Sequence, residues 1–148
     1  PSRAIRKEPY KVEVDLNLAT ATTTKGSALA SADVLQVIDV PAKTMVWAAG
    51  LEVVTPNDGD FQIDIGTGAD PDAFADNFDC DGTSTGDMTS IPAAYAPLIV
   101  SADDTIDVVI GPTVGSADPT SGVWRVFAVM QDVSDDLGPD EVDRDQLA

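Results

Sequence analysis

The residues with the clearest ligand spacing lie between positions 77 and 82. Asn77, Asp79 and Asp81 place an oxygen-bearing side chain at every second position, and Gly82 follows directly. This N-x-D-x-D-G pattern matches the first half of an EF-hand calcium loop, in which alternate oxygens ligate the ion and the glycine permits a sharp turn. The spacing makes this loop a candidate calcium site.

The second half of the loop departs from that pattern. The twelfth position, where a bidentate glutamate belongs, is Met88, although Asp87 beside it could supply an oxygen. The alternative is a solvated loop whose side chains cap their own backbone. We therefore predict a protein that needs no metal and no other cofactor, and we retain one weak calcium candidate made up of Asn77, Asp79, Asp81 and Asp87.

The composition excludes several common kinds of catalytic site. The 148 residues include no histidine, which removes Ser-His-Asp and Cys-His mechanisms and His-ligated metals. The single cysteine, Cys80, lies between two aspartates whose charge raises the thiol pKa, so it is a poor nucleophile. A glycosidase would need one buried carboxyl of raised pKa, whereas the acids here fall mostly in turns or at outward strand positions. The sequence predicts that the protein is not an enzyme.

Charge is unevenly distributed along the chain. The net charge is −18, and residues 12–131 contribute −15 of it, while residues 132–148 contribute −6. A body this acidic repels nucleic acid and anionic lipid, so we expect neither as a partner. The N-terminal bases have no apolar stretch behind them, and the apolar runs are too short to span a bilayer. The protein is thus expected to be made in a host cytoplasm and used without export.

The first nine residues differ from the rest in charge and composition. They carry +2 and two prolines, and they precede the first alternating segment. Chain ends of this kind need a partner to order them, and arginine suits such contacts because it binds carboxylates through two hydrogen bonds. We predict a docking arm whose partner-binding residues are Arg3, Ile5, Arg6 and Lys7.

Short β-strands dominate the rest of the pattern. Strict alternation of apolar and polar residues, or short apolar runs between turn signals, is typical of strands. Such segments occur at residues 10–18, 34–40, 44–54, 60–66, 95–100, 104–110 and 123–131.

The intervening residues suggest the connections. The PNDG turn at 56–59 is expected to join its two flanking strands as a hairpin, and Gly50 is expected to form a bulge. Residues 19–33 are small and polar, which indicates a loop or a weak edge strand. Residues 70–76 could start one helical turn capped by an aspartate, and a short helix could occupy 139–147.

These elements predict an all-β protein: an antiparallel β-sandwich, jelly-roll-like, with an extended N-terminal arm and an acidic C-terminal tail. The domain boundaries are a basic arm at 1–9, a single β-sandwich domain at 10–133 and an acidic tail at 134–148.

Two of the strands are apolar on both faces. Residues 44–54 and 123–130 contain Trp47 and Trp124, and most tryptophans in apolar strands belong to the core. A strand with two apolar faces is either covered on both sides within the chain or covered by a partner subunit. We therefore also predict a homo-oligomer, with a trimer as the expected form.

The strand segments VLQVIDVPAKTMVWAAGLEVVT, DFQIDIGTGADPDAFAD and YAPLIVSADDTIDVVIG resemble small structural proteins of tailed bacteriophages. The resemblance covers residues 34–131 and is strongest for head decoration, or cement, proteins. It implies a β-rich virion protein, often trimeric, on the outer capsid surface, where it clamps neighbouring major capsid protein subunits. It transfers no functional residues.

Three other functions remain open at this point. A carbohydrate- or calcium-binding β-sandwich module would show exposed aromatics on one face and a filled loop at 77–87. A head or tail fibre component would be elongated, with a coiled or threaded shaft. A glycosidase would show two convergent carboxylates in a deep cleft.

Overall fold

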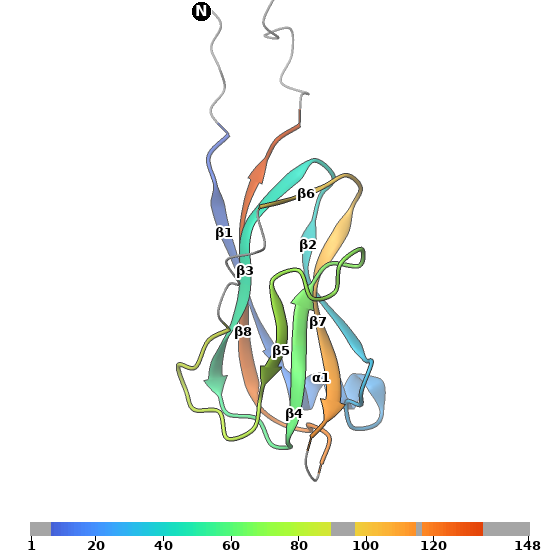
Figure 1. Ribbon diagram of the computed structural model, residues 1–148. Helices are drawn as coiled ribbons and strands as arrows, with labels where there is room; N and C mark the ends of the chain where they lie inside the picture. Colours follow the sequence, from blue (N-terminus) through green and yellow to red (C-terminus); the bar gives the residue numbers. More distant parts are fainter. Residues whose placement is uncertain (1–6, 90–96, 115–116, 135–148) are drawn as a thin grey trace, which may run out of the picture.

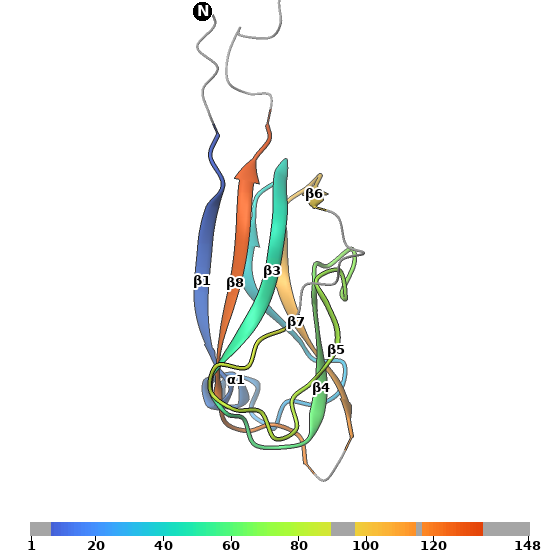
Figure 2. The same cartoon turned by 60° about the vertical axis from the view of Figure 1, so that its left-hand side comes forward.

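Two four-stranded antiparallel sheets lie face to face in the computed structural model, which describes residues 7–89, 97–114 and 117–134 (Figures 1 and 2). Sheet A has the order β1 (Tyr10–Asn17), β8 (Val123–Asp132), β3 (Thr44–Thr55) and β6 (Leu98–Val100). Sheet B has the order β2 (Val34–Val40), β7 (Asp104–Thr113), β4 (Phe61–Gly66) and β5 (Ala75–Asp79). The described residues also include a helix, α1 (Leu18–Lys25), which lies at one end of the sandwich (Figure 1).

The strand pairs are nested. The first strand pairs with the eighth, the second with the seventh, the third with the sixth and the fourth with the fifth, all antiparallel. This is the order obtained when one long antiparallel ribbon is rolled into two sheets, as in jelly rolls. The predicted antiparallel β-sandwich is confirmed.

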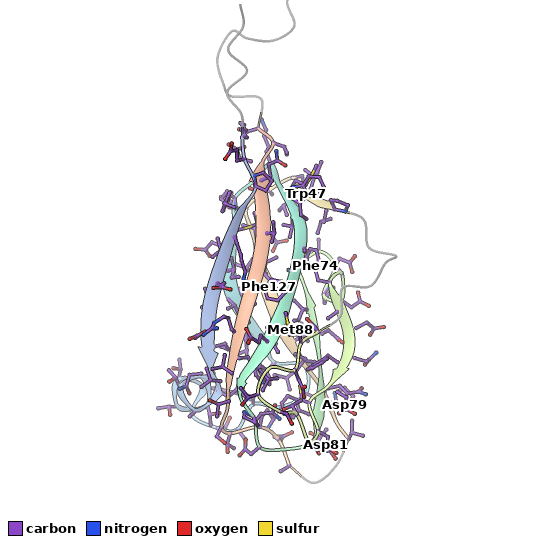
Figure 3. All side chains as sticks on the ribbon, turned by 90° about the vertical axis from the view of Figure 1, so that its left-hand side faces the viewer. Trp47, Phe74, Asp79, Asp81, Met88 and Phe127 are labelled. Atoms are coloured by element: carbon purple, nitrogen blue, oxygen red, sulfur yellow. The ribbon has the colours of Figure 1, made fainter. Side chains whose placement is uncertain are left out.

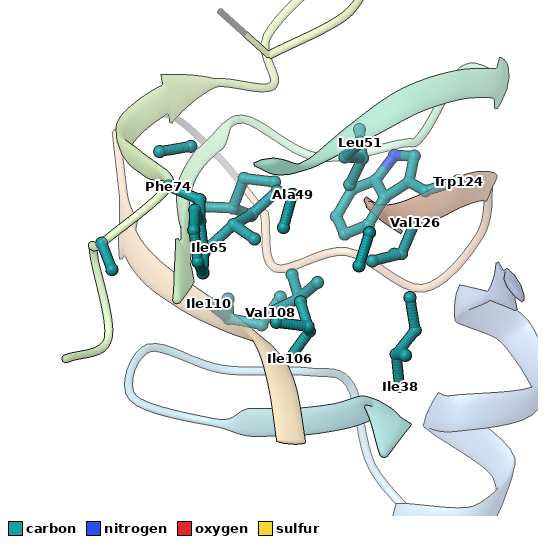
Figure 4. Close-up of a cluster of buried hydrophobic side chains, with 14 of the residues drawn as sticks. Ile38, Ala49, Leu51, Ile65, Phe74, Ile106, Val108, Ile110, Trp124 and Val126 are labelled. Carbon is teal, nitrogen blue, oxygen red and sulfur yellow. The ribbon is translucent and has the colours of Figure 1, made fainter. Parts of the chain in front are cut away.

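The inner faces of the two sheets share one apolar core (Figure 4). Trp124 of sheet A is fully buried, and its ring centroid lies 5.9 Å from that of Phe61 in sheet B. Around this pair pack Ile38, Leu51, Ile63, Ile65, Ile106, Val108, Ile110 and Val126. Each fully buried aliphatic side chain of this size contributes about 1.5–3 kcal/mol, so alternation along the strands is what holds the sheets together.

The expected hairpin across residues 56–59 is wrong. Strand β3 pairs with β8 and β6, whereas β4 pairs with β5 and β7 in the other sheet. Both edges of β3 are taken by β8 and by β6 with the segment at 86–89, and both edges of β4 are taken by β5 and β7, so the two strands have no free edge with which to pair. The turn therefore carries the chain from sheet A to sheet B.

Residues 19–33 also differ from expectation, because α1 begins at Leu18. The Asn17 side chain caps the helix by accepting a hydrogen bond from the Thr20 amide at 3.1 Å, and Gly26 ends it at φ 83°. The residues between are mostly threonine and alanine without amphipathic spacing, so the helix gives little pattern to detect. The expected helical turn at 70–76 is absent, since those residues form turns that lead into β5 at Ala75.

Gly50 does not form a bulge. The register of β3 shifts between Val46 and Ala48 and again near its end, while Gly50 stays in register opposite Phe127. A Cβ atom at Gly50 would lie 2.8 Å from Phe127 Cζ and 2.7 Å from Thr89 Oγ1. The glycine is needed because a neighbouring ring covers the strand there.

Candidate functional site

The aspartates of the candidate calcium loop cap their own turns. Asp79 Oδ1 accepts a hydrogen bond from the Asp81 amide at 2.9 Å, and Asp87 Oδ2 accepts one from the Ser84 amide at 2.7 Å. The Asn77 side chain donates to Asp76. The two aspartate contacts are local side-chain-to-backbone hydrogen bonds of the kind that stabilise loops without a ligand.

The four candidate ligands are also divided between two edges. Asn77 and Asp79 belong to β5 of sheet B, whereas Asp87 lies in a segment that runs along β3 of sheet A, where the Val53 amide donates to the Asp87 carbonyl at 2.8 Å. Within the described residues, histidine, cysteine, aspartate and glutamate form no group of three or more able to hold a metal ion. The prediction that no metal is needed stays a prediction, and the separation of these residues argues against a tight calcium site at the weak candidate.

Cys80 is buried immediately after β5. Burial, with the charge of Asp79 as a second cause, raises the pKa of the Cys80 thiol to about 12. The sequence identified the neighbouring charge, but burial has the larger effect. A thiol with so high a pKa stays protonated at neutral pH and is a poor nucleophile.

Of the predicted docking residues, Arg3, Ile5 and Arg6 lie outside the described residues, whereas Lys7 contacts its own chain. Lys7 Nζ lies 3.0 Å from Asp132 Oδ1 and donates to Ser134 Oγ at 2.7 Å. Hydrogen bonds from Ser134, and then from Lys7, hold the pKa of Asp132 at about 2. The two ends of the described chain thus meet at one end of the sandwich. Partner binding by these four residues stays a prediction.

The outer face of sheet A carries an apolar stripe (Figure 3). The pairing of β3 with β6, with β8 and with the segment at 86–89 places the residues of this stripe on the side of the sheet that faces away from the core. The apolar side chains on this side are those of Met45, Trp47, Met88, Ile99, Phe127 and Val129. Trp47 is 45% exposed, so its assignment to the core is wrong, whereas that of Trp124 is confirmed. The register shift beside Trp47 turns it outward, where its Nε1 donates to Gln131 Oε1 at 2.9 Å.

Charged groups on this face pair with one another. Arg125 Nε lies 2.9 Å from Asp15 Oδ1, and its Nη1 lies 3.8 Å from Glu52 Oε2. Lys11 pairs with Glu13 and lies 5.5 Å from the centre of the Phe127 ring. The ammonium over this ring makes a cation–π contact. The stripe is therefore bordered by charges of both signs that already have partners.

Sheet B has the opposite electrostatic character. Its four strands contain six acids and no base: Asp39, Asp64, Asp76, Asp79, Asp104 and Asp107. Asp107 is buried, and this burial raises the pKa of its carboxyl, which a hydrogen bond from Thr105 only partly offsets. The molecule thus has one acidic sheet and one sheet whose outer face is apolar and nearly neutral.

An open groove of about 400 Å³ lies between α1 and β2. Apolar side chains of Leu16, Leu29 and Leu35 line it, and the Lys25–Asp33 ion pair is part of its wall. Hydrogen bonds from Lys25 and from the Ala30 amide lower the pKa of Asp33. This ion pair is satisfied within the chain and leaves the groove without an unpaired charge among its described acids and bases.

Comparison with solved structures finds this fold in two phage capsids. A chain of the cyanophage Pam1 capsid asymmetric unit superposes with a TM-score of 0.58 at 13% identity, over 88% of this chain and 89% of that one. A chain of the acidic stable capsid structure of Helicobacter pylori bacteriophage KHP30 gives 0.54 at 11% identity, over 86% and 89%. No family model and no curated protein sequence matches the chain.

These matches concern the fold, and they span nearly the whole of each chain. They agree with the expectation that the sequence resembles phage structural proteins. Among the described residues, no helix has the length and apolar character that crossing a membrane requires.

The feature that the sequence reasoning missed is the outward position of Trp47. A signal was present, because residues 44–54 and 123–130 are apolar on both faces, but that pattern does not say which side is covered.

Proposed function

We propose that this protein is a phage virion structural protein, and specifically a decoration or cement protein of the capsid. The observation that carries the proposal is the fold, which matches a chain of the cyanophage Pam1 capsid asymmetric unit over 88% of this chain. The proposed location is the outer capsid surface, and the proposed partner is the major capsid protein.

The proposed mechanism is binding. A copy that bridges two neighbouring subunits must be released before those subunits separate, so its binding free energy adds to the stability of the shell. An interface of about 800 Å² per partner is enough for specific binding, and the capsid lattice raises the local concentration of sites. The acidic sheet B would face the solvent, because five of its six acids are exposed or partly exposed and favour hydration.

Within this proposal the basic arm at 1–9 contacts the capsid. Lys7 marks where the arm meets the sandwich, through its contacts with Asp132 and Ser134. The Lys7 side chain is 14% exposed and that of Asp132 53% exposed, and an ion pair open to solvent on one side contributes about 1 kcal/mol, so we expect the fold not to depend on the arm. At a protein interface, by contrast, Arg3 and Arg6 can make paired hydrogen bonds to carboxylates and Ile5 can occupy a pocket.

The proposal is tested by deleting the gene from the phage genome that encodes it. The account expects particles that assemble without the chain but release DNA at a lower temperature, measured with a dye that fluoresces on binding DNA. Adding the purified protein back should restore the release temperature. Particles whose release temperature is the same with and without the chain would argue against a cement role.

A deletion of residues 1–9 separates docking from folding. The truncated chain should melt within a few degrees of the full chain but occupy fewer sites on the particle at moderate salt. The matched control replaces Lys43, a base on the sandwich itself, with glutamine. Equal occupancy of full and truncated chains would exclude a docking role for the arm, and loss of folding would place the arm in the core.

A further inference from the structure

The apolar stripe on sheet A is the largest concentration of exposed apolar side chains in the described part of the chain. Trp47, Met88 and Ile99 are 45%, 53% and 54% exposed, and all three lie on this face. Half-buried Phe127 and Val129 extend the patch from β3 onto the neighbouring strand β8. Figure 3 shows Trp47, Met88 and Phe127 on this side of the molecule. Exposed apolar patches of this kind mark interaction surfaces in water-soluble domains.

The dimensions of the face suit a protein partner. Strand β8 has ten residues and sheet A four strands, so the face measures roughly 34 Å by 14 Å in projection at ordinary strand spacings. The projected area of roughly 480 Å² is of the same order as the ~800 Å² per partner of a standard interface. A small ligand would need a concave site, whereas this is an open sheet face.

The charges on the face select the kind of partner. Arg125 and Lys11 are already paired with Asp15, Glu52 and Glu13 of the same chain, so a partner need not supply a strong charge of either sign. A surface with an apolar stripe and balanced charges is complementary to another copy of itself. We propose that copies of this chain associate with one another through the outer face of sheet A.

The distance between the acidic sheets of two copies favours association through sheet A over association through sheet B. Packed sheets lie about 10 Å apart, so two copies joined through sheet A hold their acidic sheets roughly 30 Å from each other. Contact through sheet B would bring those acids within about 10 Å. The screening length is about 8 Å at physiological salt, so only the first arrangement places the acidic sheets beyond it.

The proposal also fixes the sign of the salt dependence. Each copy carries a net charge of −18, so the residual repulsion between copies weakens as salt is added. Association between copies should therefore tighten with salt, whereas binding to a basic partner would loosen. This self-association does not rest on a capsid role, because the purified chain alone tests it.

The test measures the mass of the purified full chain by sedimentation between about 1 and 100 µM. The variant Ile99→Glu places a charge in the stripe, and Val34→Glu is its matched control. Val34 is also an aliphatic strand residue, is 53% exposed and lies on sheet B, at the groove between α1 and β2. Both variants should melt close to the wild-type temperature, because both side chains are exposed.

We expect the wild type to exceed the 15.4 kDa of one chain and to associate more tightly at about 500 mM than at 50 mM NaCl. Ile99→Glu should raise the dissociation constant at least about tenfold, and Val34→Glu less than about twofold. A wild type that is monomeric throughout would overturn the proposal. So would association that is equally sensitive to both variants or that weakens with salt.

Tryptophan fluorescence gives an independent readout. Trp124 is fully buried and Trp47 is exposed, so acrylamide should quench only Trp47 in a single copy. Dilution of the wild type should therefore increase the quenchable fraction, and Ile99→Glu should show the higher fraction at every concentration. A quenchable fraction independent of concentration in an associating sample would place the contact elsewhere.

Discussion

Replacing Asp58 with alanine should loosen the end of the sandwich at which β3 leads into β4. Asp58 Oδ1 accepts hydrogen bonds from the Thr120 amide at 2.8 Å and the Ser121 amide at 2.7 Å. Its Oδ2 accepts one from Thr120 Oγ1 at 2.5 Å. One carboxylate thus joins the turn after β3 to the loop that precedes β8, two segments more than 60 residues apart in the chain.

The size of the effect follows from these three bonds. Hydrogen bonds to charged groups contribute about 1.5–3 kcal/mol each, but this carboxylate is exposed and water can replace it, so about 1 kcal/mol per bond is appropriate. Asp58→Ala should therefore lower the free energy of unfolding by about 2–3 kcal/mol. For a domain of this size that corresponds to a fall in Tm of roughly 5–10 °C.

The control for this variant lies in the same loop. Asp118 accepts one hydrogen bond, from Thr113 Oγ1 at 2.6 Å, so Asp118→Ala removes the same charge with one bond instead of three. Thermal unfolding followed by circular dichroism at pH 7 should rank the two variants clearly. Equal falls in Tm would refute the hydrogen-bond argument.

The pH dependence provides a second check on Asp58. Burial alone would raise the pKa of its carboxyl, but the bonds from Thr120 and Ser121 lower it overall. The ionised group is favoured by the fold, so its contribution is complete above the ordinary pKa of 3.8 and is lost as pH falls through the lower folded value. The Tm difference between wild type and Asp58→Ala should close in acid. A difference that stays constant down to about pH 2 would contradict this assignment.

Three further predictions concern the acidic side of the molecule. Gly66→Ala should lower the free energy of unfolding by about 3 kcal/mol, because a Cβ atom there would lie 2.0 Å from the Asp70 carbonyl oxygen. Gly82→Ala should lower it by about 1 kcal/mol, because the site is open but has φ +60°. Urea unfolding of both variants checks this order. Excess EDTA should change the Tm by less than about 3 °C, because a loop without a bidentate ligand binds calcium weakly; a fall of about 10 °C would make the calcium site real. Cys80 should react with a thiol reagent at pH 8 only after unfolding, and rapid reaction of the folded protein would contradict its burial.

The sandwich could be predicted from the sequence because alternation is a local signal. In β1 and β8, for instance, every second residue is apolar and faces the core, and the strand bounds follow directly. Which strands pair is not local. The turn at 56–59 has the composition of a hairpin turn, yet the edges of β3 are taken by β8, β6 and residues 86–89 and those of β4 by β5 and β7, partners that lie elsewhere in the sequence.

The sequence predicted only part of what the outer face of sheet A shows. The apolar positions on both sides of β3 and β8 indicated a covered second face, but the register shift beside Trp47, which sends that side chain outward, depends on how β3 pairs with β8. At the calcium pattern, the sequence predicted more than the fold supports. Its spacing was correct for ligands, but the pairing of β5 and of residues 86–89 with different sheets separates Asn77 and Asp79 from Asp87.

The most direct test of the proposed function counts this chain on intact virions. Quantitative mass spectrometry of purified particles from the encoding phage gives its ratio to the major capsid protein, and a labelled antibody applied to unopened particles shows whether it lies outside. The account predicts a fixed ratio, reproducible between preparations, with label distributed over the whole head. Absence from purified virions, or label confined to the tail, would contradict it.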